Sequence, residues 1–324
     1  MKQILLSAQA ARNNFIATLG KLLQWVDAYE HVNEVTVEDD TKKVDWLRVL
    51  PFFFIHLMCL GVIWVGWSPV AVLVAFGLYF FRMLAITGFY HRFFSHKTFK
   101  TSRVVQFIFA VLGASAAQRG PLWWASHHRH HHLHSDKHED VHSPKQHGFL
   151  WSHLGWFTSA KNFPPKLYRV PDLVKFKELV WLDRFDALVP IALTVSLYVA
   201  GELLAEFDPS LNTNGGQMLV WGFFISTVIL YHATYTVNSL AHKVGKRRYN
   251  TKDDSRNNLV VALITCGEGW HNNHHHFPGS ARQGFYWWEV DVTYYFLKLL
   301  SWLGIIWDLK TVPDEMKNSR LADK

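Results

Sequence analysis

Four long apolar stretches dominate the pattern of hydrophobic and polar positions along this chain of 324 residues. Each approaches the length, about 20 residues, that an α-helix needs to cross a bilayer core of about 30 Å. A soluble domain rarely contains so many stretches of this kind. The pattern therefore predicts four transmembrane helices, over residues 49–67, 70–90, 187–205 and 218–237.

Three further stretches show helical spacing without the length or the apolarity of a span. Residues 104–117 are apolar but too short to cross, so they are expected to be interfacial or buried. In residues 4–26 an arginine and two asparagines interrupt the apolar positions, which argues against a secretory signal. We expect an amphipathic helix there, on the membrane or against a partner. A second amphipathic segment is expected near residues 284–309.

The basic residues are distributed unevenly around the predicted spans. Of the 33 lysines and arginines, 32 lie in residues 1–48, 91–185 and 238–324, and the short links within each pair of spans contain none. By the positive-inside rule, both termini and the middle segment are expected to be cytoplasmic. The chain then divides into an N-terminal helix and linker (1–48), two spans (49–90), a cytoplasmic domain (91–186), two spans (187–237) and a cytoplasmic segment (238–324).

Arg82 is the basic residue inside a predicted span. It lies nine residues before His91, so it is roughly 13 Å further along the helix toward the bilayer interior. Two interpretations stay open at this point. Its guanidinium either snorkels toward the cytoplasmic interface or has a partner inside the helix bundle.

The composition narrows the possible chemistry. Hydrophobic residues make up 49% of the chain, which is apolar for a soluble protein, and the net charge of +7 suits a membrane surface or an anionic partner. The two cysteines, Cys59 and Cys266, are far apart in sequence. They exclude a disulfide framework, a cysteine zinc site and a self-contained iron–sulfur cluster. Any metal must therefore be held by nitrogen or oxygen.

Histidine spacing supplies the candidate ligands. Neutral imidazole is the commonest protein ligand for transition metals, and its pKa of about 6.5 leaves it mostly neutral at pH 7. Spacings of three and four residues place side chains on one helical face. Two segments have these spacings: HRHHH, with His128, His131 and His132, and HNNHH, with His271, His274 and His275. A third segment, HRFFSH, has the i, i+5 pair His91 and His96. Together they predict a metal site built from histidines.

These segments, in their order relative to the spans, resemble the membrane fatty acyl-CoA desaturases, the stearoyl-CoA desaturase family, with short bacterial members most similar. The resemblance covers about residues 45–305 and includes GFLWSHLGW, NSLAH and GEGWHNNHHHFP. It implies an all-α integral membrane protein, expected in a bacterial inner membrane. Four transmembrane helices would be capped by a cytoplasmic helical domain that carries a histidine-rich di-metal site.

The resemblance also implies two non-haem iron ions. Nine histidines would be ligands: His91, His96, His128, His131, His132, His242, His271, His274 and His275. Asn238 would contact the metal through water, and Glu139, Asp140 and Glu268 would orient imidazoles. The family pattern leaves a variable residue at His130, which is not expected to be a ligand. Roles beside the ligands or at the surface are expected for His127, His134, His138, His142 and His276.

The implied reaction is O2-dependent desaturation of a saturated fatty acyl chain, with a cis double bond expected at the Δ9 position. A bent apolar tunnel would hold the chain and exclude water. Its bend would be lined by Gln118, Trp124, Thr234 and Tyr235, the last replacing a tryptophan of the family, and its floor by Tyr79 and Met83. Ordinary packing is the alternative role for the four bend residues. Tyr79 and Met83 could instead simply face lipid or neighbouring helices.

The acyl carrier and the electron donor are less closely defined. Family members that take acyl-CoA often carry an Arg-Asp pair where Ser126 and His127 stand here. We expect acyl-CoA, with phospholipid and carrier protein as alternatives. No cytochrome b5-like HPGG segment occurs. An external ferredoxin-, rubredoxin- or cytochrome b5-like donor, with its reductase, is therefore expected at the basic cytoplasmic face, and nucleic acid is not expected as a partner.

Two other functions fit part of the pattern. A fatty-acid or alkane hydroxylase of the same superfamily uses similar clusters, but the first box here is not of the HELxH type, and NSLAH argues against it. A non-enzymatic metal-binding or transporting membrane protein would place its site near the bilayer midplane. The histidine clusters instead follow the spans at one expected cytoplasmic rim.

Overall fold

The computed structural model describes residues 23–29 and 42–322. Within this part, four helical runs are long and apolar enough to cross a membrane: Trp46–Val65, Pro69–Ser95, Leu188–Phe207 and Gly215–His242. They coincide with the predicted spans, so the prediction of an all-α protein with four transmembrane helices is confirmed. The amphipathic helix expected at residues 4–26 falls outside the described residues except for its last four positions.

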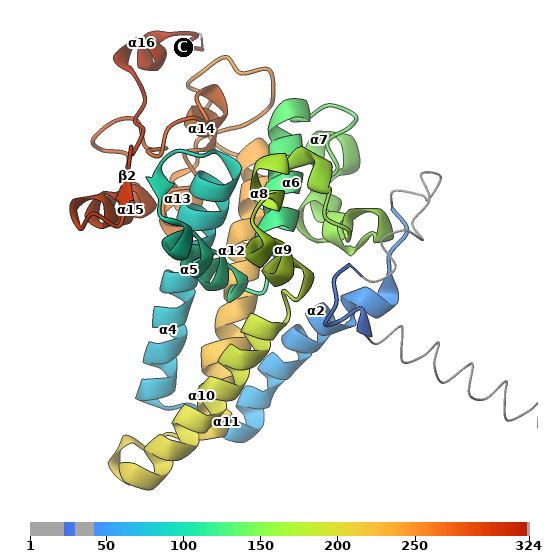
Figure 1. Ribbon diagram of the computed structural model, residues 1–324, viewed down its shortest axis with the longest axis vertical. Coiled ribbons are helices and arrows are strands. Elements are labelled where there is room, and N and C mark those ends of the chain that lie inside the picture. The colour runs from blue at the N-terminus through green and yellow to red at the C-terminus, as the bar shows by residue number, and fades with distance from the viewer. Residues whose placement is uncertain (1–22, 30–41, 323–324) are drawn as a thin grey trace, which may run out of the picture.

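Three of the four spans are built from consecutive helical pieces (Figure 1). The first consists of α2 (Trp46–Met58), η2 (Cys59–Gly61) and α3 (Val62–Val65), and the second of α4 (Pro69–Leu84) and η3 (Ala85–Ser95). The third is α10 (Leu188–Phe207), and the fourth joins α11 (Gly215–Leu219), η9 (Val220–Ile225), α12 (Ser226–Ser239) and η10 (Leu240–His242). Both η3 and η9 have the wide turns of a π-helix, a local widening that is frequent at functional sites.

Short helices and turns cap one end of the spans, as Figure 1 shows. They are α5 (Arg103–Ala114), α6 (Pro121–His134), α7 (Pro144–His147), η4 (Trp151–Gly155), η5 (Trp156–Thr158), η6 (Ala160–Asn162), η7 (Leu167–Arg169), α8 (Pro171–Val174), α9 (Lys177–Arg184), α13 (Leu259–Ile264), α14 (His271–His276), α15 (Val292–Trp302) and α16 (Asp314–Asn318). The turn η8 (Pro209–Leu211) lies between the last two spans, and β1 (Lys100–Thr101) pairs antiparallel with β2 (Ile306–Trp307).

Large apolar side chains point outward from the spans. Trp64 is 78% exposed, Leu73 69% and Phe76 68%, an arrangement that water would oppose and lipid tails accept. At the cap, by contrast, the main core joins η3 to α5, α6 and α12, with Tyr90 and Leu230 fully buried. The cap is therefore packed onto the spans that carry its histidines.

Arg82 has its partners inside the bundle. Its side chain is 3% exposed, and it donates to Thr227 Oγ1 at 2.8 Å and to the carbonyl of Ser115 at 3.3 Å. The alternative in which the guanidinium snorkels to the interface is therefore wrong. Hydroxyl and carbonyl oxygens from two neighbouring elements solvate the buried charge instead.

Candidate metal centre

A wide helical turn explains the five-residue spacing of the first box. In η3 the backbone N–H of His96 donates to the carbonyl of His91 at 3.2 Å, so residues five apart follow one another around a single turn. The two ring centroids are 4.9 Å apart. An ordinary α-helix would direct these two imidazoles to different faces.

The helix of the second box is fixed at its N-terminus. Asp183 on α9 accepts from the backbone N–H groups of Leu122 and Trp123 at 2.7 and 2.9 Å, which satisfies donors that the first turn of α6 leaves unpaired. Gly120 is needed for this close approach, because a Cβ there would lie 2.5 Å from Asp183 Cα. The anchor sets the direction in which α6 presents its histidines.

The nine predicted ligands converge in two groups at the cap. Within each group, one ligand atom from every residue lies within 4.8 Å of the others. The first group contains His91, His96, His128, His132 and His274, and the second contains His131, His242, His271 and His275. Each of the two i, i+3, i+4 boxes is thus divided, with its i, i+4 pair in one group and its remaining histidine in the other.

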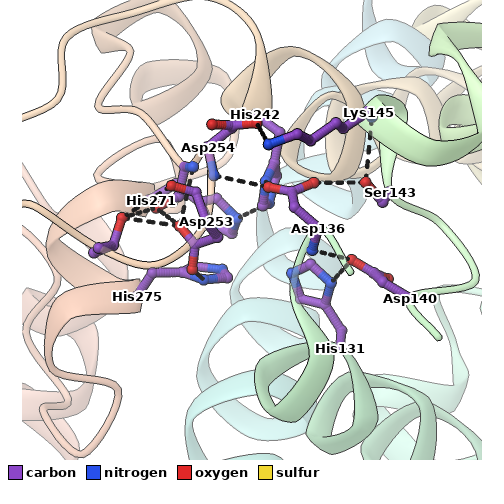
Figure 2. A network of polar contacts seen from close by, with 12 residues as sticks. His131, Asp136, Asp140, Ser143, Lys145, His242, Asp253, Asp254, His271 and His275 are labelled. Atoms are coloured by element: carbon purple, nitrogen blue, oxygen red, sulfur yellow. Dashed lines mark hydrogen bonds and ion pairs between the residues drawn. The ribbon is translucent and has the colours of Figure 1, made fainter. Parts of the chain in front are cut away.

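Carboxylates fix the rings of the second group from behind (Figure 2). His131 Nδ1 donates to Asp140 at 2.9 Å, His242 Nδ1 to Asp136 at 2.9 Å and His275 Nδ1 to Asp253 at 2.8 Å. In the neutral ring this leaves the lone pair on Nε2, directed toward the other members of the group. Such a partner orients the ring and makes it a better ligand.

The first group has one such anchor. His91 Nδ1 contacts Glu268, which also pairs with Arg92 at 2.9 Å. Burial raises the pKa of Glu268, but His91 and Arg92 more than offset this and lower it to about 2, so the carboxylate is charged at pH 7. The other rings are held by packing: Trp124 stacks on His128 with centroids 4.9 Å apart.

Nitrogen spacing in both groups fits a metal ion. Two nitrogens bound at right angles, each about 2.1 Å from one metal, lie about 3 Å apart. His274 Nε2 lies 3.0 Å from both His91 Nε2 and His132 Nε2, and His242 Nε2 lies 3.0 Å from His271 Nε2. One N–H cannot serve both neighbours of His274, whereas a shared cation satisfies all three lone pairs.

The electrostatics favour the neutral form of four ligands. Burial, followed by the neighbouring histidines, lowers the pKa of His128, His132, His271 and His274 well below 6.5. These rings are therefore unprotonated at pH 7. The buried Nε2 of His275 has no hydrogen-bond partner among the described residues, as expected of an atom that awaits a ligand.

Five of the remaining predicted positions lie apart from these two groups. His130 Nε2 donates to the carbonyl of Glu139 at 3.0 Å, and His276 Nε2 to that of Met316 at 2.8 Å. His127 is buried against Trp123, while His134 is half-buried and His138 exposed. Of the predicted orienting acids, Asp140 and Glu268 contact ligands, but Glu139 contacts His130 and His134.

His142 stacks on His131 with ring centroids 4.4 Å apart. Its Nδ1 lies 3.7 Å from Asp140, so the two histidines flank one carboxylate. This arrangement makes a third possible cluster, His131, Asp140 and His142, with all three residues buried. Because His131 Nδ1 already donates to Asp140, we assign this cluster to the support of the second group.

A large apolar cavity reaches both groups. Its volume is about 610 Å³, and four of the predicted ligands line it: His91, His128, His131 and His271. Asn238 and all four predicted bend residues, Gln118, Trp124, Thr234 and Tyr235, line the same cavity. Gln118 Nε2 donates to Thr234 Oγ1 at 2.9 Å, which ties the segment before α6 to α12.

The predicted floor residues lie elsewhere. Among the described residues that line the cavity, α4 and η3 contribute Ile86, Thr87 and His91 but neither Met83 nor Tyr79. Met83 is fully buried one turn before Thr87, which donates its hydroxyl to the Met83 carbonyl at 2.9 Å. The tunnel-floor role of this pair stays a prediction.

A second, outer cleft of about 760 Å³ lies against the same two groups but contacts other ligands. His96, His132 and His275 are in its wall, together with Arg129, Tyr168 and Arg169. No histidine ligand lines both spaces in the described part of the chain. The two groups therefore form the partition between an apolar cavity and an open cleft.

Sequence comparison with known proteins assigns the chain that builds this site to a family. The family model described as "Fatty acid desaturase" matches residues 64–298. The chain belongs to the membrane fatty acid desaturase family. It is 35% identical over 312 residues to the acyl-CoA C20 Δ5-desaturase of Anemone leveillei, covering 90% of this chain and 93% of the relative.

Other desaturases of the family are named for lipid-bound chains. The sn-1 stearoyl-lipid 9-desaturase of Anabaena variabilis is 37% identical over 283 residues, covering 85% of this chain and 98% of the relative. The chloroplastic palmitoyl-monogalactosyldiacylglycerol Δ7 desaturase of Arabidopsis thaliana is 39% identical over 290 residues, covering 88% and 74%. The predicted desaturase family is thus confirmed, at a level that includes several carriers and double-bond positions.

Proposed function

We propose that this desaturase introduces a cis double bond, at or near carbon 9, into a saturated fatty acyl chain. In the balanced reaction, two hydrogens of adjacent methylenes, two electrons and two protons reduce one O2 to two waters. The observation that carries the proposal is the cavity: it is apolar, has a volume of about 610 Å³, and is bounded by both groups of histidines. Such a site positions unactivated carbons and excludes water.

We propose that the two groups hold two iron ions through the nine histidines, with Asn238 contacting the metal of the second group through water. Imidazole suits iron, and the ring nitrogens have the spacing that one metal per group requires. Bound iron would supply the reduction of O2 that makes hydrogen abstraction possible. Asp140 and the other anchoring carboxylates would keep the rings that they contact in the tautomer that presents Nε2.

The residues at the predicted bend would hold the acyl chain against the ligands. Trp124 lies on His91 and His128, with ring centroids 5.8 and 4.9 Å away. Its indole would therefore form the wall opposite the reacting methylenes. Gln118 and Thr234 would brace this wall through their hydrogen bond.

We retain Met83 and Tyr79 as the proposed floor, with Met83 about one helical turn and Tyr79 about two turns beyond the cavity wall at Thr87. Met83 is 0% exposed, so a larger side chain there would push into the wall. Met83→Trp should then favour shorter chains, and Tyr79→Ala longer ones. Unchanged 16- to 18-carbon product ratios in two active variants would place the floor elsewhere.

The proposal also concerns the molecule that carries the acyl chain to the enzyme. Our prediction of acyl-CoA draws support from the basic segment 161–177, which contains five lysines and arginines and one acidic residue. Relatives are named both for acyl-CoA and for lipid-bound chains, so family membership is compatible with either. The route by which an acyl chain reaches the cavity distinguishes an acyl-CoA substrate from a lipid-bound one.

The outer cleft suits the external electron donor, which we propose to be a small acidic redox protein. Leu133 and Tyr168 beside the cleft are 72% and 75% exposed, and basic residues such as Arg169 surround them. An apolar centre with a charged rim is typical of transient redox interfaces, and the charge would steer an acidic partner. Electrons would then enter through the ligands in the cleft wall.

The test is the purified, iron-loaded protein with a ferredoxin, its reductase, NADPH and O2. Stearoyl chains are supplied as the CoA thioester and, separately, as phospholipid in vesicles, and products are identified by gas chromatography and mass spectrometry. A cis-9 monounsaturated product supports the proposal. A hydroxylated product alone, or no product from either carrier at full iron content, would overturn it. His274→Ala serves as the inactive control.

A further inference from the structure

The acids behind the second group of histidines have no cationic side chain to offset them. Asp136, Asp140 and Asp253 each contact one ligand of this group (Figure 2). Within residues 23–29 and 42–322, histidines are their ion-pair partners, and no lysine or arginine pairs with any of the three. Three negative charges therefore surround the second group without compensation.

These three carboxylates are held in their charged form and away from water. Asp136 is 6% exposed, and Asp140 is 0% exposed. The backbone N–H of Asp254 donates to Asp136 at 2.8 Å, and that of Asp136 donates to Asp140 at 3.0 Å. The N–H of Ser255 donates to Asp253 at 3.1 Å. Hydrogen-bond donors favour the ionised carboxylate, and burial keeps salt from screening its charge.

The acid behind the first group, by contrast, is paired with a buried arginine. One oxygen of Glu268 contacts His91, and the other accepts from Arg92 at 2.9 Å. Arg92 is 1% exposed and also pairs with Asp291 at 2.9 Å. This side of the first group therefore has two acids and one cation.

The other side of the first group has the opposite balance. Arg129 donates to the carbonyl of Ser95 at 3.1 Å, one residue before His96. Its counter-ion, Asp172, is shared with Lys97, so two cations meet one acid here. The charges on the two sides of the first group cancel, whereas those beside the second group do not.

This difference affects how readily a metal in each group accepts an electron. A nearby negative charge stabilises the higher oxidation state of a metal, and net charge is one of the factors through which a protein sets a reduction potential. The effect is strongest where water and salt do not screen the charge, as at Asp140. Iron in the second group would therefore be harder to reduce than iron in the first.

We propose that these charges give the two groups unequal reduction potentials, so that the first electron is held in the first group. The inference rests on the proposed di-iron centre and adds an order of reduction to it. One electron from the external donor converts ferric to ferrous iron in the first group, and the second electron does the same in the second group. Arg92 and the three aspartates set this order through the rings and acids that they contact.

The order agrees with the position of the outer cleft. His96 and His132 of the first group are in the wall of this cleft, where we propose that the electron donor docks. The group that is easier to reduce is thus the one with more ligands at the proposed point of electron entry. The first electron stays there until a second one arrives.

The experiment is a reductive titration of the full-length protein loaded with two irons per chain. Dithionite and redox mediators are used without O2 or acyl substrate, and Mössbauer spectroscopy counts ferrous and ferric iron at each potential. Asp253→Asn removes one charge from the second group, and Glu268→Gln removes one from the first. Asp254→Asn is the matched control: it changes the net charge equally, but Asp254 is partly exposed and pairs with Lys145.

The wild type should show two one-electron waves whose reduction constants differ at least about tenfold, which is 59 mV for one electron. Asp253→Asn should raise the constant of the lower wave about tenfold and move the upper wave less. Glu268→Gln should move chiefly the upper wave, and Asp254→Asn should move neither by more than about twofold. Asp136→Asn replaces Asp253→Asn, with the same expectation, if the latter does not hold two irons.

A single wave in a wild type that holds two irons would overturn the inference. A larger shift of the upper wave than of the lower wave in Asp253→Asn would also overturn it, because the second group would then be reduced first. Fewer than two irons per chain in the wild type after loading would instead remove the proposed di-iron centre itself.

Discussion

The two histidine groups differ in what lies behind their imidazoles. In the second group, three of the four rings have a carboxylate at Nδ1, at 2.8 to 2.9 Å. In the first group, the described residues provide one such contact, between His91 and Glu268. A carboxylate fixes the tautomer and the orientation of a ring and strengthens it as a ligand. Similar histidine spacing in the sequence thus builds two unequal sites.

The two groups also differ in how many of their ligands reach the outer cleft, and here the first group has more. Two ligands of the first group, His96 and His132, are in the wall of the outer cleft, whereas the second group contributes His275 alone. The first group is therefore more open to solvent and to a redox partner, and the second is held more firmly. We infer that the second group retains its metal and that the first exchanges it more readily.

The largest expected effect is the loss of one ligand from either group. His131→Ala and His274→Ala each leave buried neighbours without their shared cation, so each should lower activity more than about 100-fold and reduce the iron content. Metal analysis and the desaturation assay check this result. One zinc per chain, with no loss of iron in either variant, would contradict a di-iron centre.

Substitution of an anchoring acid should show how much the carboxylates of the second group contribute to metal binding. Asp253→Asn removes the charge behind His275 and should weaken metal binding by about 10–100-fold. Asp254→Asn is the matched control, because that neighbouring carboxylate pairs with Lys145 at 3.0 Å. Iron titration followed by competition with a chelator measures the difference. Equal affinities in the two variants would show that Asp253 does not support the site.

Iron release should occur in two phases. A chelator added to the loaded protein should remove one iron quickly from the open first group and the other slowly from the anchored second group. Activity should disappear with the first phase, because both metals are needed. A single phase would make the two sites equivalent, and Asp253→Asn should bring the two rates together.

Local periodicity accounts for what the sequence could predict. His128, His131 and His132 were identified because helical spacing needs no knowledge of the fold, and the four spans follow from length and apolarity. The division of each box between two groups could not be predicted in this way. It depends on the π-type turn that aligns His91 with His96 and on the angle at which α6 meets α14.

Two orienting acids were missed for a related reason. Asp136 contacts His242 across 106 residues, and Asp253 contacts His275 across 22, so no local pattern joins either pair. Glu139 was predicted in their place because it is close to the second box in sequence. Proximity along the chain identified Asp140 and Glu268 but not these two acids, since the loops at 135–143 and 250–256 fold back onto the ligands.

The smallest expected effect concerns His130, which lies between two ligands in sequence but apart from both groups in space. Its Nε2 donates to the carbonyl of Glu139, and half-burial lowers its pKa below 6.5, so it is a neutral ring near the surface. His130→Ala removes one partly exposed hydrogen bond, worth about 1 kcal/mol of stability. Activity should change less than about twofold and both irons should stay bound, whereas His132→Ala, two residues away, should lose the first-group metal. A loss of iron in His130→Ala as large as that in His132→Ala would mean that the register of α6 is shifted, and with it the division of the second box between the two groups.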